Sequence, residues 1–374
     1  MGLSVAVVSS YRQECGIGTY TDALGQALVG RGHRVVVLAM QLDARARYFS
    51  RGGVLPYVRC WRREGWYADL EKHVSSTASQ VFHVEHEYGL HSDPAAFMIW
   101  LERLPRPIVI TLHTVPDPCL EQERDLRWLP TALSGNRARC IVHQQAGADA
   151  LRAYGCRQVT IIPHGSDPGL TPTPRHEARR RLGLPHDGVL GATLGFWTPG
   201  KRNADTMVAL MRLISRRALP DDFRFVFAGQ PMGGDADAEI RHWCARLEQL
   251  KLADRIIVRP GYVDDAVMCD YFGAADFIVA NSGPTMFSIS GRGHLCMGYG
   301  AAVLAADVPL LSEFRECGLV FGSGAQLEDG LRRLAHDVDL RQRLSAQSRA
   351  YAEQTSWARV AEMHEQVYEE ALSP

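Results

Sequence analysis

Hydrophobic residues gather along this chain in short runs that alternate with loops and with amphipathic stretches of about ten to twenty residues. The first six runs are rich in Val and Ile and nearly all apolar, as is typical of strands covered on both faces. These runs span residues 4–10, 34–40, 81–87, 108–115, 139–144 and 159–165. The alternation with helical stretches predicts a doubly wound parallel α/β sheet.

A second series of apolar runs follows a segment that holds four of the 19 Pro. Its runs span residues 189–197, 223–229, 255–263, 276–282, 301–306 and 318–322. The predicted fold class is therefore α/β, with two Rossmann-like doubly wound domains facing a central cleft. We expect an N-terminal domain over 1–168, a linker over 169–188, a C-terminal domain over 189–354, and a helix over 355–374 that crosses back to the N-terminal domain.

Charge and cysteine content narrow the function classes. The 374 residues carry a formal net charge of −1 with no long run of one sign, so we expect no nucleic-acid partner. The nine Cys are an odd number without a CxxC pair, which argues against a disulfide framework. With no apolar run of about 18 residues and no signal-peptide pattern, a cytoplasmic protein is expected, and peripheral membrane contact stays open.

Glycines follow the first predicted strand. Gly16 and Gly18 would let backbone amides at a helix start approach a phosphate closely. The loop fails the GxGxxG dinucleotide fingerprint because Thr21 stands where the third Gly is needed. A tight turn without a ligand remains an alternative for this loop.

Polar residues follow two neighbouring strands of the first series. His86, Glu87 and Tyr88 lie at the C-terminal end of one predicted strand and His113 at that of the next, where a doubly wound sheet builds its site. The alternative for each histidine is a hydrogen-bonded structural residue, and for His83 and His143 this alternative is favoured.

Cations and hydroxyls mark two loops of the second series. Lys201 and Arg202 lie at a predicted helix start, where positive charge opposes the helix dipole and invites an anion, unless the pair is simply solvated. A later loop is rich in hydroxyl groups and Gly, has no carboxylate, and leads into a short helix whose free amides suit a phosphate. Its candidate ligands are Ser288, Ser290, Gly291 and Arg292. No GxxxxGK[ST], HExxH, GxSxG or credible metal cluster occurs.

These motifs, in this order, resemble the GT-B retaining glycosyltransferases of glycosyltransferase family 4 (group 1). The similar segments read GIGTY, HVEHEYGLH, TLHTV, IIPHG, GFWTPGK, FAG, GYV, SGRGHLCMGYGAAVLAADVP and SWARV. The resemblance implies that Gly16 and Gly18 lie at the donor diphosphate, that His113 contacts the donor sugar and that Lys201 neutralises the leaving diphosphate. It also implies nucleoside contacts at Gly229, Tyr262 and Val263.

The chain departs from the family pattern at three positions. The two Glu that the family often carries eight residues apart are replaced by Phe287 and Leu295, which places the chain with the subgroup lacking that pair. Gly195 stands where the family often has an Arg, and Arg202 or Arg292 could supply that charge.

The resemblance implies a hexosyltransferase that moves a sugar from a nucleotide-diphosphate sugar to an acceptor hydroxyl with retention and without a metal or cofactor. The acceptor side would include His86, Glu87 and Tyr88, and the acceptor would be a carbohydrate, a lipid-linked molecule or a small molecule. A nucleotide-sugar epimerase of GT-B fold and a catalytically silent relative are the alternatives. The sequence does not specify the base, the sugar, the acceptor or the oligomeric state.

Overall fold

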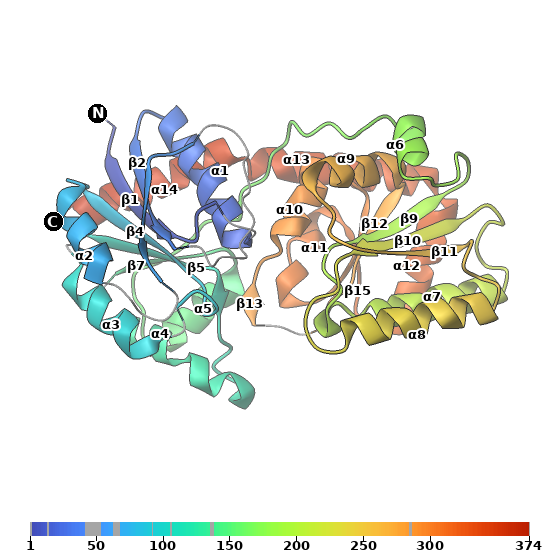
Figure 1. Cartoon of the computed structure of the whole chain (residues 1–374), viewed down its shortest axis with the longest axis horizontal. Coiled ribbons are helices and arrows are strands. Elements are labelled where there is room, and N and C mark those ends of the chain that lie inside the picture. Colours follow the sequence, from blue (N-terminus) through green and yellow to red (C-terminus); the bar gives the residue numbers. More distant parts are fainter. Residues whose placement is uncertain are drawn as a thin grey trace. The chain divides into compact units, whose positions relative to one another are not determined.

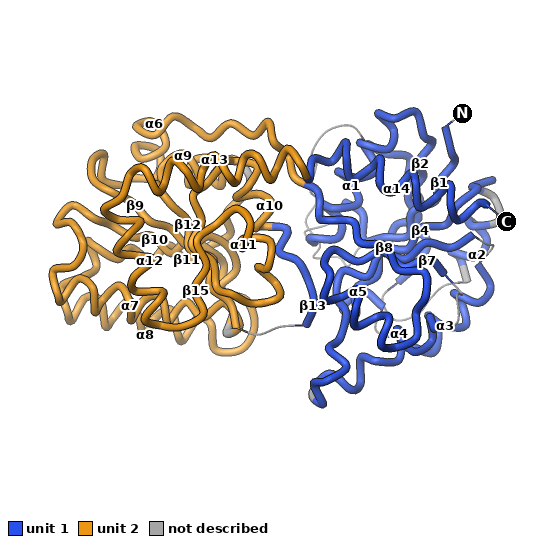
Figure 2. Tube along the Cα trace, turned by 180° about the vertical axis from the view of Figure 1, so that it is seen from behind, with its two compact units in different colours: residues 1–165, 286–291, 355–374 blue, residues 166–285, 292–354 orange. Residues whose placement is uncertain are grey.

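The chain forms two compact units (Figures 1 and 2). Unit 1 comprises residues 1–165, 286–291 and 355–374, and unit 2 comprises residues 166–285 and 292–354. The computed structural model describes residues 2–12, 15–41, 54–62, 68–91, 93–104, 107–134, 138–283 and 286–373. None of the described helices is long and apolar enough to cross a membrane. All nine cysteines lie among the described residues and are free thiols.

Unit 1 is built on a parallel sheet in which seven strands fall within the described residues. Their order is β3-β2-β1-β4-β5-β7-β8. They are β1 (Ser4–Ser9), β2 (Arg34–Met40), β3 (Tyr57–Trp61), β4 (Val81–His86), β5 (Ile108–Leu112), β7 (Arg139–Val142) and β8 (Val159–Ile161). The strands β1, β4 and β5 are buried along their whole length, as strands with both faces covered must be.

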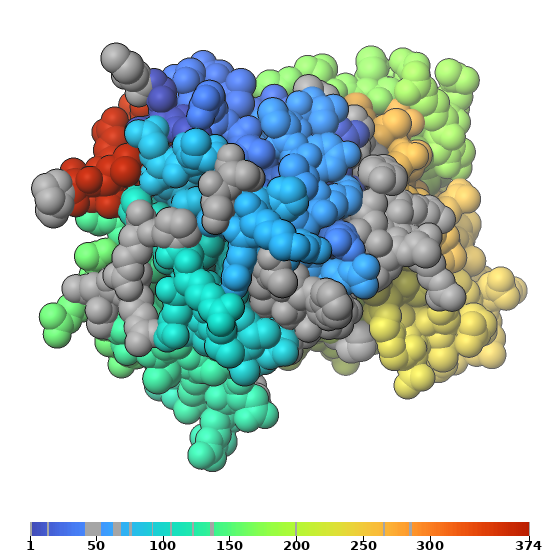
Figure 3. All heavy atoms as spheres, turned by 60° about the vertical axis from the view of Figure 1, so that its left-hand side comes forward, coloured from blue at the N-terminus to red at the C-terminus, as the bar shows by residue number. Residues whose placement is uncertain are grey.

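Helices surround the unit 1 sheet. They are α1 (Gly16–Gly30), α2 (Ala68–Ser76), α3 (Pro94–Arg103), the 3₁₀ helix η1 (Glu121–Leu126), α4 (Trp128–Leu133), α5 (Gln145–Ala153) and α14 (Trp357–Leu372). The last helix, α14, packs beside α1 and against β4 and β5, and it buries Val360 and Tyr368 completely. The segment with η1 projects from unit 1 as the teal-green extension at the lower edge of Figures 1 and 3.

Unit 2 repeats the architecture with a parallel sheet of six strands within the described residues. Their order is β11-β10-β9-β12-β14-β15. They are β9 (Leu190–Leu194), β10 (Arg224–Gly229), β11 (Ile256–Pro260), β12 (Phe277–Ala280), β14 (Val303–Ala306) and β15 (Leu319–Phe321). The helices are α6 (Arg175–Arg181), η2 (Pro199–Lys201), α7 (Asn203–Ser215), α8 (Ala236–Gln249), α9 (Asp265–Ala274), α10 (Gly291–Gly298), η3 (Pro309–Leu311), α11 (Phe314–Cys317), α12 (Gly324–His336) and α13 (Val338–Gln354).

One short segment belongs to a different unit than its place in the sequence suggests. Residues 286–291 were expected inside the domain 189–354, but the structure groups them with unit 1. There β13 (Phe287–Ser288) pairs antiparallel with β6 (Thr114–Val115). The Phe287 ring packs near Gly147 and against the apolar core of unit 1, which explains the grouping.

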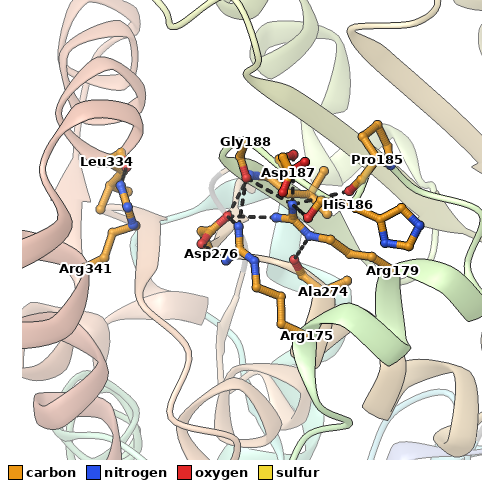
Figure 4. A network of polar contacts seen from close by, with 11 residues as sticks. Arg175, Arg179, Pro185, His186, Asp187, Gly188, Ala274, Asp276, Leu334 and Arg341 are labelled. Atoms are coloured by element: carbon orange, nitrogen blue, oxygen red, sulfur yellow. Dashed lines mark hydrogen bonds and ion pairs between the residues drawn. The ribbon is translucent and has the colours of Figure 1, made fainter.

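A buried guanidinium holds the start of unit 2 together (Figure 4). Arg179 on α6 is 1% exposed, and its Nη1 donates to the carbonyls of residues 185–188 at 3.0 to 3.3 Å. Its Nε donates to Ala274 O (3.1 Å) and its Nη2 to Asp276 Oδ2 (3.1 Å). Asp276 also accepts from the backbone N–H of Leu190 at the start of β9 (2.8 Å). One side chain therefore fastens the loop before β9 to the residues before β12.

We predict that Arg179→Met lowers the free energy of unfolding of unit 2 by about 1–3 kcal/mol, because the carbonyls of Ala274 and of residues 185–188 would lose a shared donor and Asp276 would keep only Arg175 as a charged partner. Arg180→Met on the same helix is the matched control, since Arg180 is exposed. Urea unfolding of the full chain measures both variants. Equal midpoints for the two variants would contradict the role given to Arg179.

Candidate functional site

The predicted site residues follow the carboxyl ends of strands in both units. In unit 1 they come after β1, β4 and β5 and in the segment 286–291, and in unit 2 they come after β9, β10 and β11 and on α10. Ligands of doubly wound sheets bind at these strand ends. Among the described residues, no group of three or more His, Cys, Asp or Glu is arranged to hold a metal ion.

The glycine loop of unit 1 opens directly into α1. The first intrahelical donor is the amide of Thr19, which donates to Cys15 O (3.1 Å), so the amides of Gly16 and Gly18 precede the helical ladder. No acidic side chain stands in the first turn of α1. A Cβ built on Gly16 meets nothing within 4 Å. This helix start therefore keeps both space and donors for an anion.

His113 directly follows β5, and both of its ring nitrogens are hydrogen bonded. Nε2 lies 2.8 Å from Glu85 Oε2, and Nδ1 lies 3.2 Å from His143 Nε2. The His143 Nδ1 in turn lies 2.9 Å from the carbonyl of Ile162. The residue is 7% exposed, so its ring is positioned by contacts inside unit 1. His83 is also fully buried and bonded, to Thr111 and Tyr368, as its structural interpretation predicts.

Burial controls the protonation of this cluster. Desolvation lowers the pKa of His113 to about 4, although the charge of Glu87 acts in the opposite direction. Desolvation raises the pKa of Glu85 to about 7, with His83 opposing the shift. The sequence interpretation missed Glu85. The signal was a carboxyl inside the apolar run 81–87, where a charge is costly.

Glu87 and Tyr88 are half-buried and organise the loop after β4. The hydroxyl of Thr114 donates to Glu87 Oε2 (2.6 Å), and the amide of Tyr88 donates to Glu87 Oε1 (2.9 Å). The Tyr88 hydroxyl donates to Leu126 O (2.8 Å). These bonds connect the loop to the residues after β5, and the acceptor-side role of both residues stays a prediction.

His86 is enclosed by aromatic rings of unit 1. It is fully buried and stacks on His91 with ring centroids 5.2 Å apart, and it also contacts the rings of Tyr88, Phe97 and Trp128. Neither ring nitrogen has a hydrogen-bond partner among the described residues. Desolvation lowers the pKa of this histidine well below its usual value. His86 therefore packs inside unit 1, and its acceptor-side role stays a prediction.

The cations of unit 2 follow β9. Lys201 ends η2 and is half-buried, and desolvation, with a further contribution from the charge of Arg292, lowers its pKa. Its ammonium makes no hydrogen bond or ion pair with another described residue. Arg202 has a left-handed backbone (φ 43°) and an exposed side chain 3.7 Å from Asp205. Its carbonyl accepts from Asn281 Nδ2 (3.3 Å), which fixes the turn.

Arg292 occupies the space that a side chain at position 195 would fill. A Cβ built on Gly195 would lie 2.8 Å from Arg292 Nε, and Gly195 itself has φ +120°. The guanidinium lies 6.0 Å from the ring centre of Phe196 and 3.7 Å from Met268 Sδ. Position 195 carries no positive charge of its own, but the guanidinium of Arg292 on α10 lies next to Gly195.

A buried hydrogen-bonded chain positions α10. Ser166 Oγ lies 2.7 Å from His294 Nδ1, and His294 Nε2 lies 2.7 Å from Glu313 Oε2. The hydroxyl of Tyr351 donates to the other carboxyl oxygen of Glu313 (3.2 Å). His294 is 1% exposed, so this chain fixes the helix that carries Arg292. Sequence reasoning did not single out these residues, which lie far apart along the chain.

The three residues expected at the nucleoside follow β10 and β11. A Cβ on Gly229 would lie 1.5 Å from the carbonyl oxygen of Gly195, so only glycine allows the two loops to approach. Tyr262 is exposed, and Val263 packs against the unit 2 core. Their nucleoside contacts stay predictions.

Three candidates from the hydroxyl-rich loop, Ser288, Ser290 and Gly291, lie in unit 1, and Arg292 lies in unit 2. The carbonyl of Ser288 accepts from Gln144 Nε2 (2.9 Å), and Gly291 begins α10, which has no acidic residue in its first turn. A Cβ on Gly291 would lie 3.3 Å from His164 Nε2. Ser290 lies between them and is half-buried. Phe287 packs on the unit 1 core and Leu295 on the unit 2 core, so the two positions that lack Glu serve packing.

We predict that His86→Phe stabilises the protein by about 1 kcal/mol at pH 7, because it removes two unbonded buried nitrogens. The stability difference between His86→Phe and the wild type should grow as the pH falls below about 6.5. In the wild type, the unfolded state then binds a proton on His86 that the folded state does not bind, which favours unfolding. Urea unfolding at pH 7 and pH 5.5 measures this. The control His242→Phe changes an exposed ring and should leave the pH dependence as it is. An unchanged pH dependence in His86→Phe would contradict the burial argument.

Comparison with known proteins agrees with this fold. Residues 15–170 match the model of Glycosyltransferase Family 4. A D-inositol 3-phosphate glycosyltransferase of Stackebrandtia nassauensis is 29% identical over 218 residues, which are 55% of this chain and 47% of that protein. The chain thus matches about half the length of this curated relative.

Solved structures resemble the chain over nearly its whole length. HepE of Anabaena, solved in complex with UDP and glucose, has a TM-score of 0.75 at 18% identity and covers 98% of this chain and 100% of its own. Sucrose-phosphate synthase of Thermosynechococcus elongatus has a TM-score of 0.72 at 19% identity and covers 98% of both chains. A glycosyltransferase of Rickettsia africae has a TM-score of 0.75 at 13% identity and covers 100% and 99%.

The two doubly wound units and these likenesses confirm the α/β fold class and the resemblance predicted from the sequence. The chain has the GT-B fold, and its residues 15–170 match the model of Glycosyltransferase Family 4.

Proposed function

We propose that the chain is a retaining glycosyltransferase that moves a sugar from a nucleotide-diphosphate sugar to an acceptor hydroxyl without a metal. The observation that carries the proposal is the pair of cations in unit 2. Desolvation and the nearby charge of Arg292 lower the pKa of the half-buried Lys201, and Lys201 has no carboxylate partner among the described residues. A half-buried ammonium without an acidic partner costs free energy until an anion joins it, and a diphosphate supplies that anion.

Backbone donors extend the proposed diphosphate site. Gly16 and Gly18 at the start of α1, and Gly291 at the start of α10, would contribute amides at helix N-termini. Ser288 and Ser290 would add hydroxyls, and Arg202 is an exposed cation beside Lys201. These groups provide the hydrogen bonds that phosphate oxygens need.

The sugar would meet an uncharged His113. Both of its nitrogens are bonded inside unit 1, and its pKa of about 4 keeps the ring neutral at pH 7. The nucleoside would lie at Gly229, Tyr262 and Val263, and the acceptor near Glu87 and Tyr88. HepE, a structural neighbour, binds UDP and glucose, so UDP-sugars are the first donors to test.

The proposed reaction depends on charge compensation. The bond between the sugar C1 and the diphosphate oxygen breaks while the acceptor oxygen bonds to C1 on the same face. The acceptor proton passes to the departing diphosphate, so no side chain has to act as base. Lys201 and Arg292 stabilise the negative charge that grows on the leaving group.

We predict that Lys201→Ala lowers turnover at least about 100-fold, as is typical of the loss of one preorganised charge. Lys251→Ala is the matched control, because Lys251 is an exposed residue that follows α8. Initial rates at saturating donor measure both variants. Unchanged turnover in Lys201→Ala would mean that this ammonium is only a solvated surface charge.

Arg292→Gln should weaken donor binding by about 10- to 100-fold, since a charge-assisted hydrogen bond contributes about 1.5–3 kcal/mol. Calorimetric titration with UDP-glucose, GDP- and dTDP-sugars measures the affinity, with Arg241→Gln on the exposed face of α8 as control. Equal affinity in the Arg292 variant would place the diphosphate elsewhere. Release of a sugar isomer without an acceptor would instead indicate an epimerase, and binding without turnover a silent relative.

A further inference from the structure

Three side chains of unit 1 form an unbroken line of hydrogen bonds that ends on a backbone carbonyl. The line runs from Glu85 through His113 and His143 to Ile162, with distances of 2.8, 3.2 and 2.9 Å. Glu85 is fully buried, and His113 and His143 are 7% and 6% exposed. Solvent therefore contributes little to its proton balance.

The carbonyl fixes the direction of each bond. The oxygen of Ile162 can only accept, so His143 Nδ1 must carry a proton. An uncharged His143 then accepts at Nε2, which requires a proton on His113 Nδ1. An uncharged His113 in turn has a bare Nε2, and the bond to Glu85 Oε2 forms only when the carboxyl supplies a proton.

Three hydrogen bonds thus need three protons, one more than an ionised carboxylate and two neutral imidazoles carry. Moving the extra proton from Glu85 to His113, or onward to His143, keeps all three bonds and the same total. We propose that Glu85, His113 and His143 together hold this extra proton, and that Glu85 is the positioning residue that fixes the His113 ring.

The surroundings of the line favour a cluster without net charge. The titratable groups that face it include Tyr20 on α1, His83 and His86 on β4, His164 after β8, and His364 and Tyr368 on α14, which are neutral in their ordinary forms at pH 7. The carboxylate of Glu87, after β4, also acts on His113, and its negative charge disfavours a second negative charge within the line. Glu85 lies 3.6 Å from His83, whose pKa burial lowers to about 4, so His83 does not compensate an ionised Glu85.

The position of the proton within the line follows from burial. The pKa of Glu85 is raised to about 7 and that of His113 is lowered to about 4, both chiefly by desolvation. The neutral pair is therefore favoured, with the proton on the carboxyl. When the pH rises past about 7, Glu85 loses this proton. Lone pairs of Glu85 Oε2 and His113 Nε2 then face each other, and the His113 ring loses one of its two hydrogen bonds.

Glu85→Gln is the decisive variant, because its amide N–H can donate to His113 Nε2 but does not titrate. The histidine-ring ¹⁵N and carboxyl ¹³C resonances of the full-length apo protein count the protons at pH 6. We expect three protons in the wild type, and a coupled shift of the His113 and His143 resonances between pH 6 and 8.5 that is missing in Glu85→Gln. Glu71→Gln is the control, because Glu71 is a half-buried residue of α2 that pairs with Arg103, and the resonances of His113 and His143 in this variant should shift as in the wild type.

Two protons at pH 6, or the same titration in Glu85→Gln as in the wild type, would overturn the proposed proton count. The number of protons held by Glu85, His113 and His143 does not depend on the proposed function. The positioning role of Glu85 rests on the proposed function. With a working donor, kcat/KM of the wild type should fall about tenfold per pH unit above the midpoint, and Glu85→Gln should not show this fall. The same fall in both proteins would overturn the positioning role. Absence of transfer with every donor would instead overturn the proposed function and leave the proton count standing.

Discussion

The apolar cover on both faces of β4 and β5 is the constraint on which the polar part of unit 1 depends. Water cannot reach the side chains of these strands, so polar groups there are stabilised only by partners within the protein. His83 pairs with Thr111 and with Tyr368 of α14, and Glu85 Oε2 pairs with His113, whereas Glu85 Oε1 and both nitrogens of His86 have no hydrogen-bond partner among the described residues. The position of His113 is a consequence of that pairing.

Unit 2 meets a different requirement, which is to bring positive charges together beside a strand end. The backbone at Gly195 turns with a positive φ, and the absent side chain leaves room for the guanidinium of Arg292. A cation can therefore reach the same place from another element. The hydrogen bonds from Ser166 to His294 and from His294 to Glu313 anchor α10, the helix that carries Arg292.

The sequence predicted well the strands whose faces are both covered, since the run 81–87 corresponds to the fully buried β4. It missed β3 and β13, which are short and owe their existence to partners that local pattern does not reveal. Phe287 illustrates the limit, because only its packing near Gly147 explains an apolar residue there. The burial of His86 was not foreseen for a related reason, since the ring stack that buries it forms only in the folded unit.

The site could be predicted only in part. Lys201 and Arg292 were named from charge and motif, and the structure places them within each other's electrostatic influence. Glu85 was overlooked because its partner lies 28 positions away, and His294 because its partners lie 128 and 19 positions away. Hydrogen bonds between distant residues leave no periodic trace in a sequence.

The short strand β13 has a practical consequence for dividing the protein. The backbone passes between the units four times, after residues 165, 285, 291 and 354. A fragment cut at 166 and 354 would retain Phe287 but lose Val115, its pairing partner, and the unit 1 core on which its ring packs. Such a fragment would expose an aromatic side chain and an unpaired strand edge, and both promote aggregation. Isolating unit 2 in soluble form therefore requires replacing residues 286–291 with a polar connection.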